Sequence, residues 1–223
     1  MIEEILEQAR GKGSRALSEF ESKKVIESAG VPITREDLAK TKEEAISIAR
    51  KLGYPVVLKG CSDKLTHKTE LGVIKLGLES DEDVEEAYEE IITKASGVDG
   101  VLVQEMVHGD RELVIGLSRD PQFGPCVMFG LGGIYTEALS DVAFRVAPIT
   151  EIDAREMIEE IRTKKIMGEF RGSPAVNTEI LIKALVGISE LGKKYDEIAE
   201  IDINPIIVSG NKPVAVDALV VLS

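Results

Sequence analysis

Hydrophobic residues recur at helical spacing in the first hundred positions and at strand spacing in much of the remainder. Residues 18–30 and 41–53 each begin with Ser or Thr followed three positions later by Glu, and each run stops at a glycine. This arrangement is typical of a capped helix. Residues 81–95 place five apolar side chains on one helical face. With short extended runs between these helices, the order predicts a compact α/β lobe that ends near residue 97.

Beyond residue 100, short apolar runs separated by turn signals predict a strand-rich region. The expected strands are 101–106, 112–117, 126–129, 143–147, 201–208 and 213–221. Two helices, 153–163 and 177–195, interrupt them. We therefore expect a small α/β lobe followed by a larger α+β lobe, with a cleft between the two.

Composition narrows the classes of function. The 223 residues carry a formal net charge of −13, which argues against the basic footprint of a nucleic-acid binder. No apolar run approaches the ~20 residues of a membrane span, and the acidic amphipathic start is unlike a signal peptide. Cys61 and Cys126 lie far apart, as in a reduced cytoplasmic protein. Abundant Glu, Lys and Ile favour a thermophilic source. Any anionic ligand must be held by a local cluster of cations and backbone amides.

Residues 55–78 hold the first candidate chemistry. A β-branched run delivers Lys59 to a strand end, and the polar loop that follows carries His67 between Lys64 and Lys68. A cation fixed by a strand and an imidazole on the adjoining loop suit phosphate chemistry. An ordinary edge lysine and a solvated histidine are the alternatives.

The final hairpin holds the second candidate. Residues 200–205 alternate, so Glu200, Asp202 and Asn204 share one face of a strand. If residues 209–212 form the turn, antiparallel pairing places Asn204 directly across from Asp217. An amide oxygen beside a carboxylate suits Mg²⁺, which takes one or two protein carboxylates together with phosphates and waters. A polar strand face with a carboxylate–amide hydrogen bond is the alternative.

Three further segments each permit two interpretations. Residues 101–107 are either a hinge whose backbone groups pair with an adenine edge or one more core strand. Arg111 and Glu112 either reach a ribose or a metal or form an exposed ion pair. Residues 130–133 are either phosphate-binding backbone amides or a tight turn, since they match neither a P-loop nor a Rossmann fingerprint.

Three segments in this order resemble the ATP-grasp (beta) subunit of the ADP-forming acetyl-CoA synthetases, also called NDP-forming acyl-CoA synthetases. The segments are YPVVLKGCSDKLTHKTELGVIKLGL at 54–78, the run from VLVQEMVHGDREL to DVAFRVAP at 101–148, and EIDINPIIV with VAVDALV at 200–220. The resemblance extends over residues 19–222. It implies an α/β ATP-grasp fold with a nucleotide cleft between a small N-terminal lobe, 1–99, and a larger C-terminal lobe, 100–223.

The resemblance also implies roles for individual residues. The implied nucleotide ligands are Lys59 at the phosphates, Gln104, Glu105, Met106 and Val107 at the adenine hinge, and Glu112 just beyond it. The implied Mg²⁺ ligands are Asn204 and Asp217. His67 is the implied phosphorylated histidine, on a loop that carries a phosphoryl group, and Asp202 is the acid that supports it.

The implied activity is the reversible conversion of acyl-CoA, ADP and phosphate into free acid, CoA and ATP, with ATP or ADP and Mg²⁺ as cofactors. A CoA-binding alpha subunit with a first phosphohistidine is the implied partner, in an α2β2 assembly. Two alternatives stay open. One is a nucleotide-sensing regulatory module of an acyltransferase complex. The other is a succinyl-CoA synthetase-like beta subunit, which we disfavour because that chain continues into a further domain.

Overall fold

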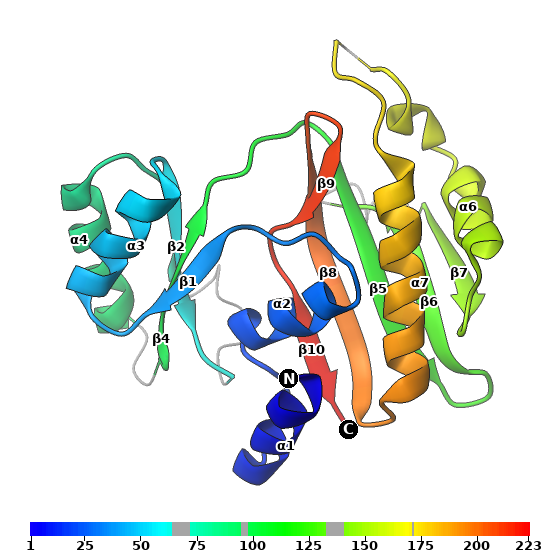
Figure 1. The fold of residues 1–223 in the computed structure, drawn as a ribbon, viewed down its shortest axis with the longest axis horizontal. Helices are drawn as coiled ribbons and strands as arrows, with labels where there is room; N and C mark the ends of the chain where they lie inside the picture. The colour runs from blue at the N-terminus through cyan, green and yellow to red at the C-terminus, as the bar shows by residue number, and fades with distance from the viewer. Residues whose placement is uncertain (64–71, 95–97, 133–140, 171) are drawn as a thin grey trace. The chain divides into compact units, whose positions relative to one another are not determined.

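The computed structural model describes residues 1–63, 72–94, 98–132, 141–170 and 172–223 (Figure 1). Contacts between Cα atoms divide the chain into two compact units. Unit 1 comprises Met1–Gln8, Ser22–Ile33 and Val107–Ser223, and unit 2 comprises Ala9–Glu21 and Thr34–Met106. Helices α1 (Ile2–Lys12) and α2 (Glu19–Ser28) each contribute residues to both units.

Unit 2 is built on a four-stranded antiparallel sheet in the order β1-β4-β2-β3. The strands are β1 (Glu36–Ala39), β4 (Gly100–Glu105), β2 (Val56–Cys61) and β3 (Ile74–Leu78). Helices α3 (Lys42–Leu52) and α4 (Asp81–Lys94) cover one face, where Val56 and Leu58 enter the core. Because side chains alternate along a strand, Val57 and Lys59 project from the opposite face.

Unit 1 is built on a larger antiparallel sheet in the order β10-β8-β5-β6-β7, with β9 paired to β8. The strands are β5 (Glu112–Asp120), β6 (Gly124–Leu131), β7 (Val142–Val146), β8 (Ile198–Ser209), β9 (Lys212–Ala215) and β10 (Leu219–Leu222). Figure 1 shows α6 (Glu151–Glu160) and α7 (Thr178–Lys194) along one face, and a short 3₁₀ turn, η1 (Lys164–Met167), follows α6. A Cβ added at Gly192 of α7 would meet Leu117 of β5 at 2.2 Å, so Leu117 faces the helices.

Most predicted elements are present with shifted ends. Both predicted capping patterns form hydrogen bonds: the Ser18 hydroxyl accepts from the Glu21 amide at 3.3 Å, and Thr41 accepts from the Glu44 amide at 3.2 Å. The structure differs in three places. The predicted strand 213–221 is split into β9 and β10, the short 3₁₀ turn η1 is additional, and so is helix α1.

The contact-defined units differ from the predicted lobes 1–99 and 100–223. Strand β4 belongs to unit 2 because it pairs with both β1 and β2, so that unit ends at Met106. In the described part of the chain, no helix is both long and apolar enough to cross a membrane.

Candidate active site

Lys59 lies in the interior of the unit 2 sheet. Its ammonium Nζ forms an ion pair with Glu19 Oε1 at 2.7 Å, and the two side chains are 7% and 1% exposed. Strand β2 is flanked by β3 and β4, so the alternative of an ordinary edge lysine is wrong. A buried ammonium requires compensation by an opposite charge, which Glu19 supplies from the first turn of α2.

Gln104 joins Lys59 on the same face of this sheet. Lys59 pairs with Leu102 on β4, while Gln104 pairs with Val57, two residues along. Side chains in such diagonal positions on neighbouring strands lie within reach of each other. Gln104 is buried, and the structure therefore brings a buried amide and a buried ammonium together on the face away from α3 and α4.

The other predicted hinge residues are held within unit 2 by their backbone or by Arg35. The Glu105 amide donates to the Arg35 carbonyl at 3.0 Å, and its carboxylate accepts from the Arg35 amide and Nε at 2.8 and 2.7 Å. The Met106 amide donates to the Pro55 carbonyl at 3.4 Å. Val107, the first residue assigned to unit 1, is half-buried. Two of the hinge amides are thus already engaged.

The acidic face of β8 follows the predicted alternation. Ile201 and Ile203 are buried, whereas Asp202 is half-buried and Asn204 exposed. The predicted turn and register are confirmed, because Ser209 pairs with Lys212.

The ladder is interrupted where the metal ligands are predicted. The β8–β9 ladder runs from Ser209 back to Ile206, which pairs with Ala215, and the β8–β10 ladder resumes in the same register where Asp202 pairs with Leu219. Asn204 and Asp217 both fall in this gap, which the Val216 amide crosses by donating to the Pro205 carbonyl at 3.1 Å. Asp217 therefore lies in a connecting segment and not within a strand.

The surroundings of Asp202 raise the pKa of its carboxyl group from 3.8 to about 6. Burial is the largest cause, followed by the negative charges of Glu200 and Asp217. This electrostatic coupling places the three acids in one region of unit 1. A bound cation would offset the repulsion among them.

Glu112 shares the face of the sheet that carries Asp202. It is the exposed first residue of β5, and Gly116, four residues later on the same face, pairs with Asp202. The β5–β8 register shifts between Leu113 and Ile115, where β8 contains an extra residue. Bulges of this kind redirect side chains and are frequent beside active sites.

The donor set fits Mg²⁺ better than a metal held by protein alone. Among the residues that the structure describes, no group of three or more His, Cys, Asp or Glu side chains is arranged to hold a metal ion. Asn204 and Asp217, if they are the ligands, would supply two hard oxygen atoms and leave positions for phosphate oxygens and waters, as Mg²⁺ usually requires.

Arg111 proves to be structural. The exposed ion pair that was its alternative is wrong: the guanidinium is buried and donates to four carbonyl groups, those of Ile166, Gly168, Pro174 and Gly210. It joins the η1 segment to the β8–β9 turn. Glu19 was not predicted from the sequence. Acidic residues are common in the first turn of a helix, so its position gave no sign of a partner on β2.

Two predicted features lie partly or wholly among residues that the structure does not describe. His67, with Lys64 and Lys68, lies outside the described residues, as does the end of the 130–133 segment. Gly130 itself belongs to β6 and pairs with Val142, so the tight turn does not begin there. The Gly132 amide donates to the Glu112 carbonyl at 2.8 Å.

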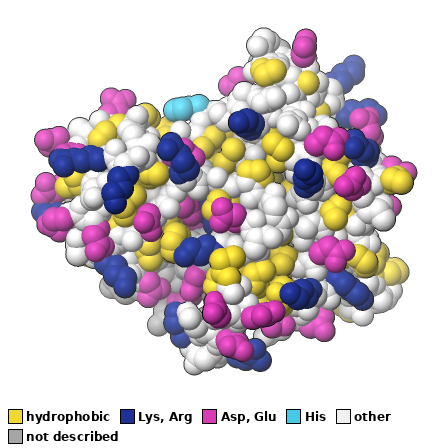
Figure 2. Space-filling model, in the orientation of Figure 1, with side chains coloured by type: hydrophobic (Ala, Val, Ile, Leu, Met, Phe, Trp, Pro, Cys, Tyr) yellow, Lys and Arg dark blue, Asp and Glu magenta, His cyan; other side chains and the backbone are white. Residues whose placement is uncertain are grey.

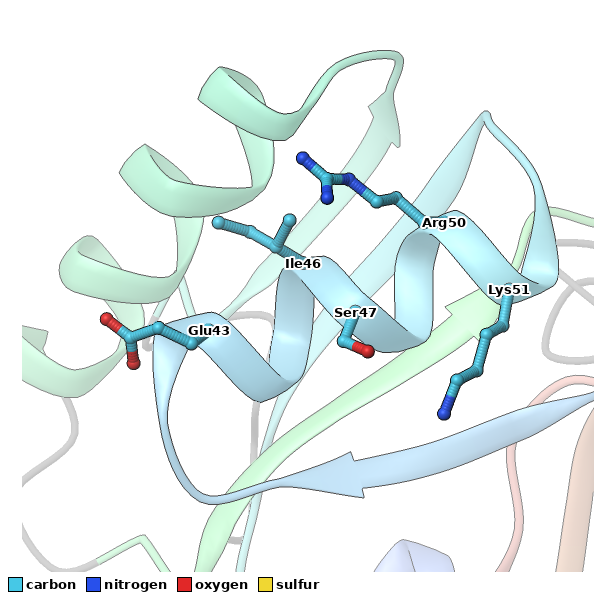
Figure 3. Close-up of a pocket in the computed structure, with 5 residues that line it drawn as sticks. All are labelled: Glu43, Ile46, Ser47, Arg50 and Lys51. Carbon is cyan, nitrogen blue, oxygen red and sulfur yellow. The ribbon is translucent and has the colours of Figure 1, made fainter.

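One surface hollow lined by described residues does not include these site residues. A hollow of about 480 Å³ lies along α3 and is lined by Glu43, Ile46, Ser47, Arg50 and Lys51, which come from a single helix (Figure 3). Acidic and basic side chains are interspersed over the face shown in Figure 2. Neither feature adds a candidate residue.

Comparison with known proteins identifies the fold first and the narrower family second. A family model described as the ATP-grasp domain matches residues 8–222. The beta subunit of ADP-forming acetate–CoA ligase I from Pyrococcus furiosus is 42% identical over 225 residues, which cover 98% of this chain and 97% of that subunit. The ADP-forming acetate–CoA ligase I of Archaeoglobus fulgidus is 39% identical over 99% of this chain but only 33% of its own length.

Solved structures agree with this result. Acetyl-coenzyme A synthetase 1 of Ca. Korarchaeum cryptofilum, in complex with coenzyme A and Ca-AMPCP, has a TM-score of 0.95 and 43% identity over the whole of both chains. The same protein with coenzyme A and Mg-AMPPCP, its phosphohistidine segment pointing towards the nucleotide binding site, has a TM-score of 0.90 at 43% identity, again over both full chains. The chain belongs to the ATP-grasp family and, within it, to the beta subunits of the ADP-forming acetate–CoA ligases. The predicted fold class and family are confirmed.

Proposed function

We propose that this chain is the nucleotide-binding subunit of an ADP-forming acyl-CoA synthetase. It passes a phosphoryl group through a phosphohistidine to ADP while acyl-CoA, ADP and phosphate become acid, CoA and ATP. The observation that carries this proposal is the full-length match to the Pyrococcus subunit. It is supported by Lys59 and Gln104, which share one face of the unit 2 sheet, and by Glu112 and Asp202, which share one face of the unit 1 sheet.

Unit 2 supplies the cation and the adenine contacts. Lys59 donates to the nucleotide phosphates, and the neighbouring Gln104 orients the nucleotide beside it. Since the amides of Glu105 and Met106 already donate to carbonyls, adenine pairs with the carbonyls of this segment and with the amide of Val107. In this proposal the side chain of Glu105 has a structural role, through Arg35.

Unit 1 supplies the acids. Asn204 and Asp217 hold Mg²⁺, and Glu112, on the face that carries Asp202, accepts from the ribose or supports the metal shell. When bound, Mg²⁺ neutralises phosphate charge and fixes the phosphate geometry, which is most of what phosphoryl transfer requires. The crowded carboxylates around Asp202 support a cation in this place.

His67 carries the phosphoryl group. In the forward direction its neutral imidazole nitrogen forms a P–N bond to the phosphoryl group as the P–N bond of the partner's phosphohistidine breaks, and the new P–N bond then breaks as an ADP β-phosphate oxygen forms a P–O bond. The freed imidazole returns to its starting state. Asp202 orients the phosphorylated ring by accepting a hydrogen bond from its other nitrogen.

A CoA-binding alpha subunit supplies the remaining chemistry in an α2β2 assembly. The Archaeoglobus relative is about three times as long as this chain, which supports a partner that is fused there and separate in Pyrococcus. Reaction of the acyl-CoA with phosphate and a first phosphohistidine belong to that partner. The chain's location in the cytoplasm is part of the same proposal.

Transfer of labelled phosphate tests the proposal. In the complete complex, His67→Ala should abolish ATP formation from acetyl-CoA, ADP and labelled phosphate, while ADP binding persists. His108→Ala is the matched control, because His108 is exposed and should leave the rate unchanged. Undiminished ATP formation by the His67 variant would contradict the phosphohistidine relay. ADP binding without any phosphoryl transfer by the intact complex would favour the regulatory module instead.

A further inference from the structure

We propose that Glu19 is a positioning residue of the nucleotide phosphate site, which holds the ammonium of Lys59 in place before the nucleotide arrives. This inference rests on the proposed function of Lys59. It adds a residue that neither the sequence pattern nor the names of the relatives assign. The observation behind it is the buried ion pair of 2.7 Å between Glu19 Oε1 and Lys59 Nζ.

Burial makes the carboxylate necessary. A lysine ammonium removed from water without a compensating charge tends to lose its proton, and the neutral amine no longer attracts phosphate. Glu19 is almost fully buried beside Lys59, so the pair enters the interior with no net charge.

The geometry allows the pair and the phosphates to be bound together. An ammonium carries three N–H donors and no acceptor, so a hydrogen bond to Glu19 is compatible with hydrogen bonds to phosphate oxygens. Glu19 cannot swing into water because its side chain is enclosed. It thus acts as a fixed anchor for Lys59 and does not compete with the phosphates.

The two acids in the first turn of α2, Glu19 and Glu21, have different roles. Glu21 closes the helix cap, since its Oε2 accepts from the Ser18 amide at 3.0 Å and from the Ser18 hydroxyl at 2.7 Å. This cap fixes the start of the helix and hence the backbone of Glu19. The carboxylate of Glu19 is directed instead to β2, forty residues further along the chain.

The groups near Lys59 define the expected pH behaviour. Across the two ladders its neighbours are apolar, and the near polar side chain on β4 is neutral, as the pairing of Ile74, Leu102 and Gln104 shows. Glu36 on β1, which pairs with Gln104, is a further acid on this face, and its Oε2 accepts from the Thr34 hydroxyl at 2.8 Å. Glu19 contacts Lys59 directly. Lys23, four residues after Glu19 on α2, is a further charged group of that helix and is completely buried.

The experiment titrates ADP with MgCl₂ into the full chain by calorimetry between pH 7 and pH 9. The wild-type chain should bind with nearly constant affinity across this range. Glu19→Gln keeps the shape of the side chain but removes its charge. Its affinity should be about tenfold lower at pH 7 and should fall further, by up to about tenfold per pH unit, as Lys59 loses its proton.

Two variants separate charge from structure. Glu27→Gln removes the same charge from an exposed position of the same helix and should reproduce the wild-type affinity and pH profile. Glu19→Asp keeps the charge on a shorter side chain. Its affinity should be intermediate, but its pH profile should be flat, as in the wild-type chain.

Three results would overturn the inference. They are an unchanged profile in Glu19→Gln, tighter ADP binding by that variant, and a steep pH dependence in Glu19→Asp. If Glu19→Gln does not fold, Glu19→Asp decides, because an ADP affinity equal to that of the wild-type chain would contradict the positioning role. A wild-type chain that binds no ADP would instead contradict the proposed function itself.

Discussion

The two sheets carry charge in opposite ways. In unit 2 the ammonium of Lys59 is enclosed and neutralised within the protein by Glu19. In unit 1 Asp202 is half-buried, and this burial, followed by repulsion from Glu200 and Asp217, raises its pKa to about 6. The first arrangement is electrostatically complete without a ligand, whereas the second gains from an added cation.

This difference predicts different effects of ligand binding in the two units. A neutralised buried pair is already organised, so phosphate gains a pre-positioned donor at little ordering cost. Repulsion within a cluster of like charges lowers the stability of the folded protein. Binding of Mg²⁺ would relieve that repulsion. Substitutions should therefore change stability in opposite directions in the two units.

The largest expected effect follows from removing the unit 2 cation. Lys59→Met leaves the enclosed Glu19 carboxylate uncompensated and should lower the free energy of unfolding by about 3–5 kcal/mol. The matched control is Lys75→Met on β3, whose pair with Glu90 is 27% and 39% exposed and should contribute less than about 1 kcal/mol. Urea unfolding measures both. An equal loss in the two variants would mean that the burial of the Lys59 pair carries no special cost.

Removal of the predicted metal ligand should come next in size. Asp217→Ala should raise the Mg²⁺ concentration needed for half-maximal ADP binding by at least about tenfold, equivalent to 1.4 kcal/mol. Asp196→Ala is the control, because its side chain is 95% exposed at the far end of α7. Identical metal titrations of the two variants would argue against a metal site at the β9–β10 junction.

A smaller effect of opposite sign should follow from neutralising Asp202. Because its folded-state pKa is raised, ionisation of Asp202 opposes folding, and the free energy of unfolding falls as pH rises from about 4 through 6. Asp202→Asn should lack this decline. The side chain is half-buried, so we expect the metal-free variant to be about 1 kcal/mol more stable than wild type at pH 7.5. Chemical unfolding in EDTA at several pH values measures it, and a decline that persists in the variant would contradict the assignment.

Local signals made much of the fold predictable. The turn at 209–212 and the alternation of Ile201 and Ile203 fix the register of the last hairpin. The structure keeps that register through the β8–β9 ladder and into the β8–β10 ladder as far as Val221. Helix starts were predictable because Ser18 and Thr41 cap them through neighbouring residues. These features depend on residues only a few positions apart.

Features that depend on distant residues were not predictable. Glu19 and Lys59 are forty positions apart, and nothing in either neighbourhood indicates that they meet. Likewise, the role of Arg111 is evident only from the structure, in which its guanidinium donates to four carbonyls that are distant in the sequence. Strand β4 could be assigned to unit 2 only from its pairing partners, because the sequence pattern of a buried strand is the same in either sheet.

The most direct test of the phosphohistidine relay is mass spectrometry of the chain after incubation with Mg-ATP labelled at the γ-phosphate. We expect one acid-labile, base-stable phosphate on the imidazole of His67, discharged on addition of ADP and absent from His67→Gln. A stably bound nucleotide with no phosphate on His67, or a phosphate on another residue that ADP discharges equally well, would contradict the relay.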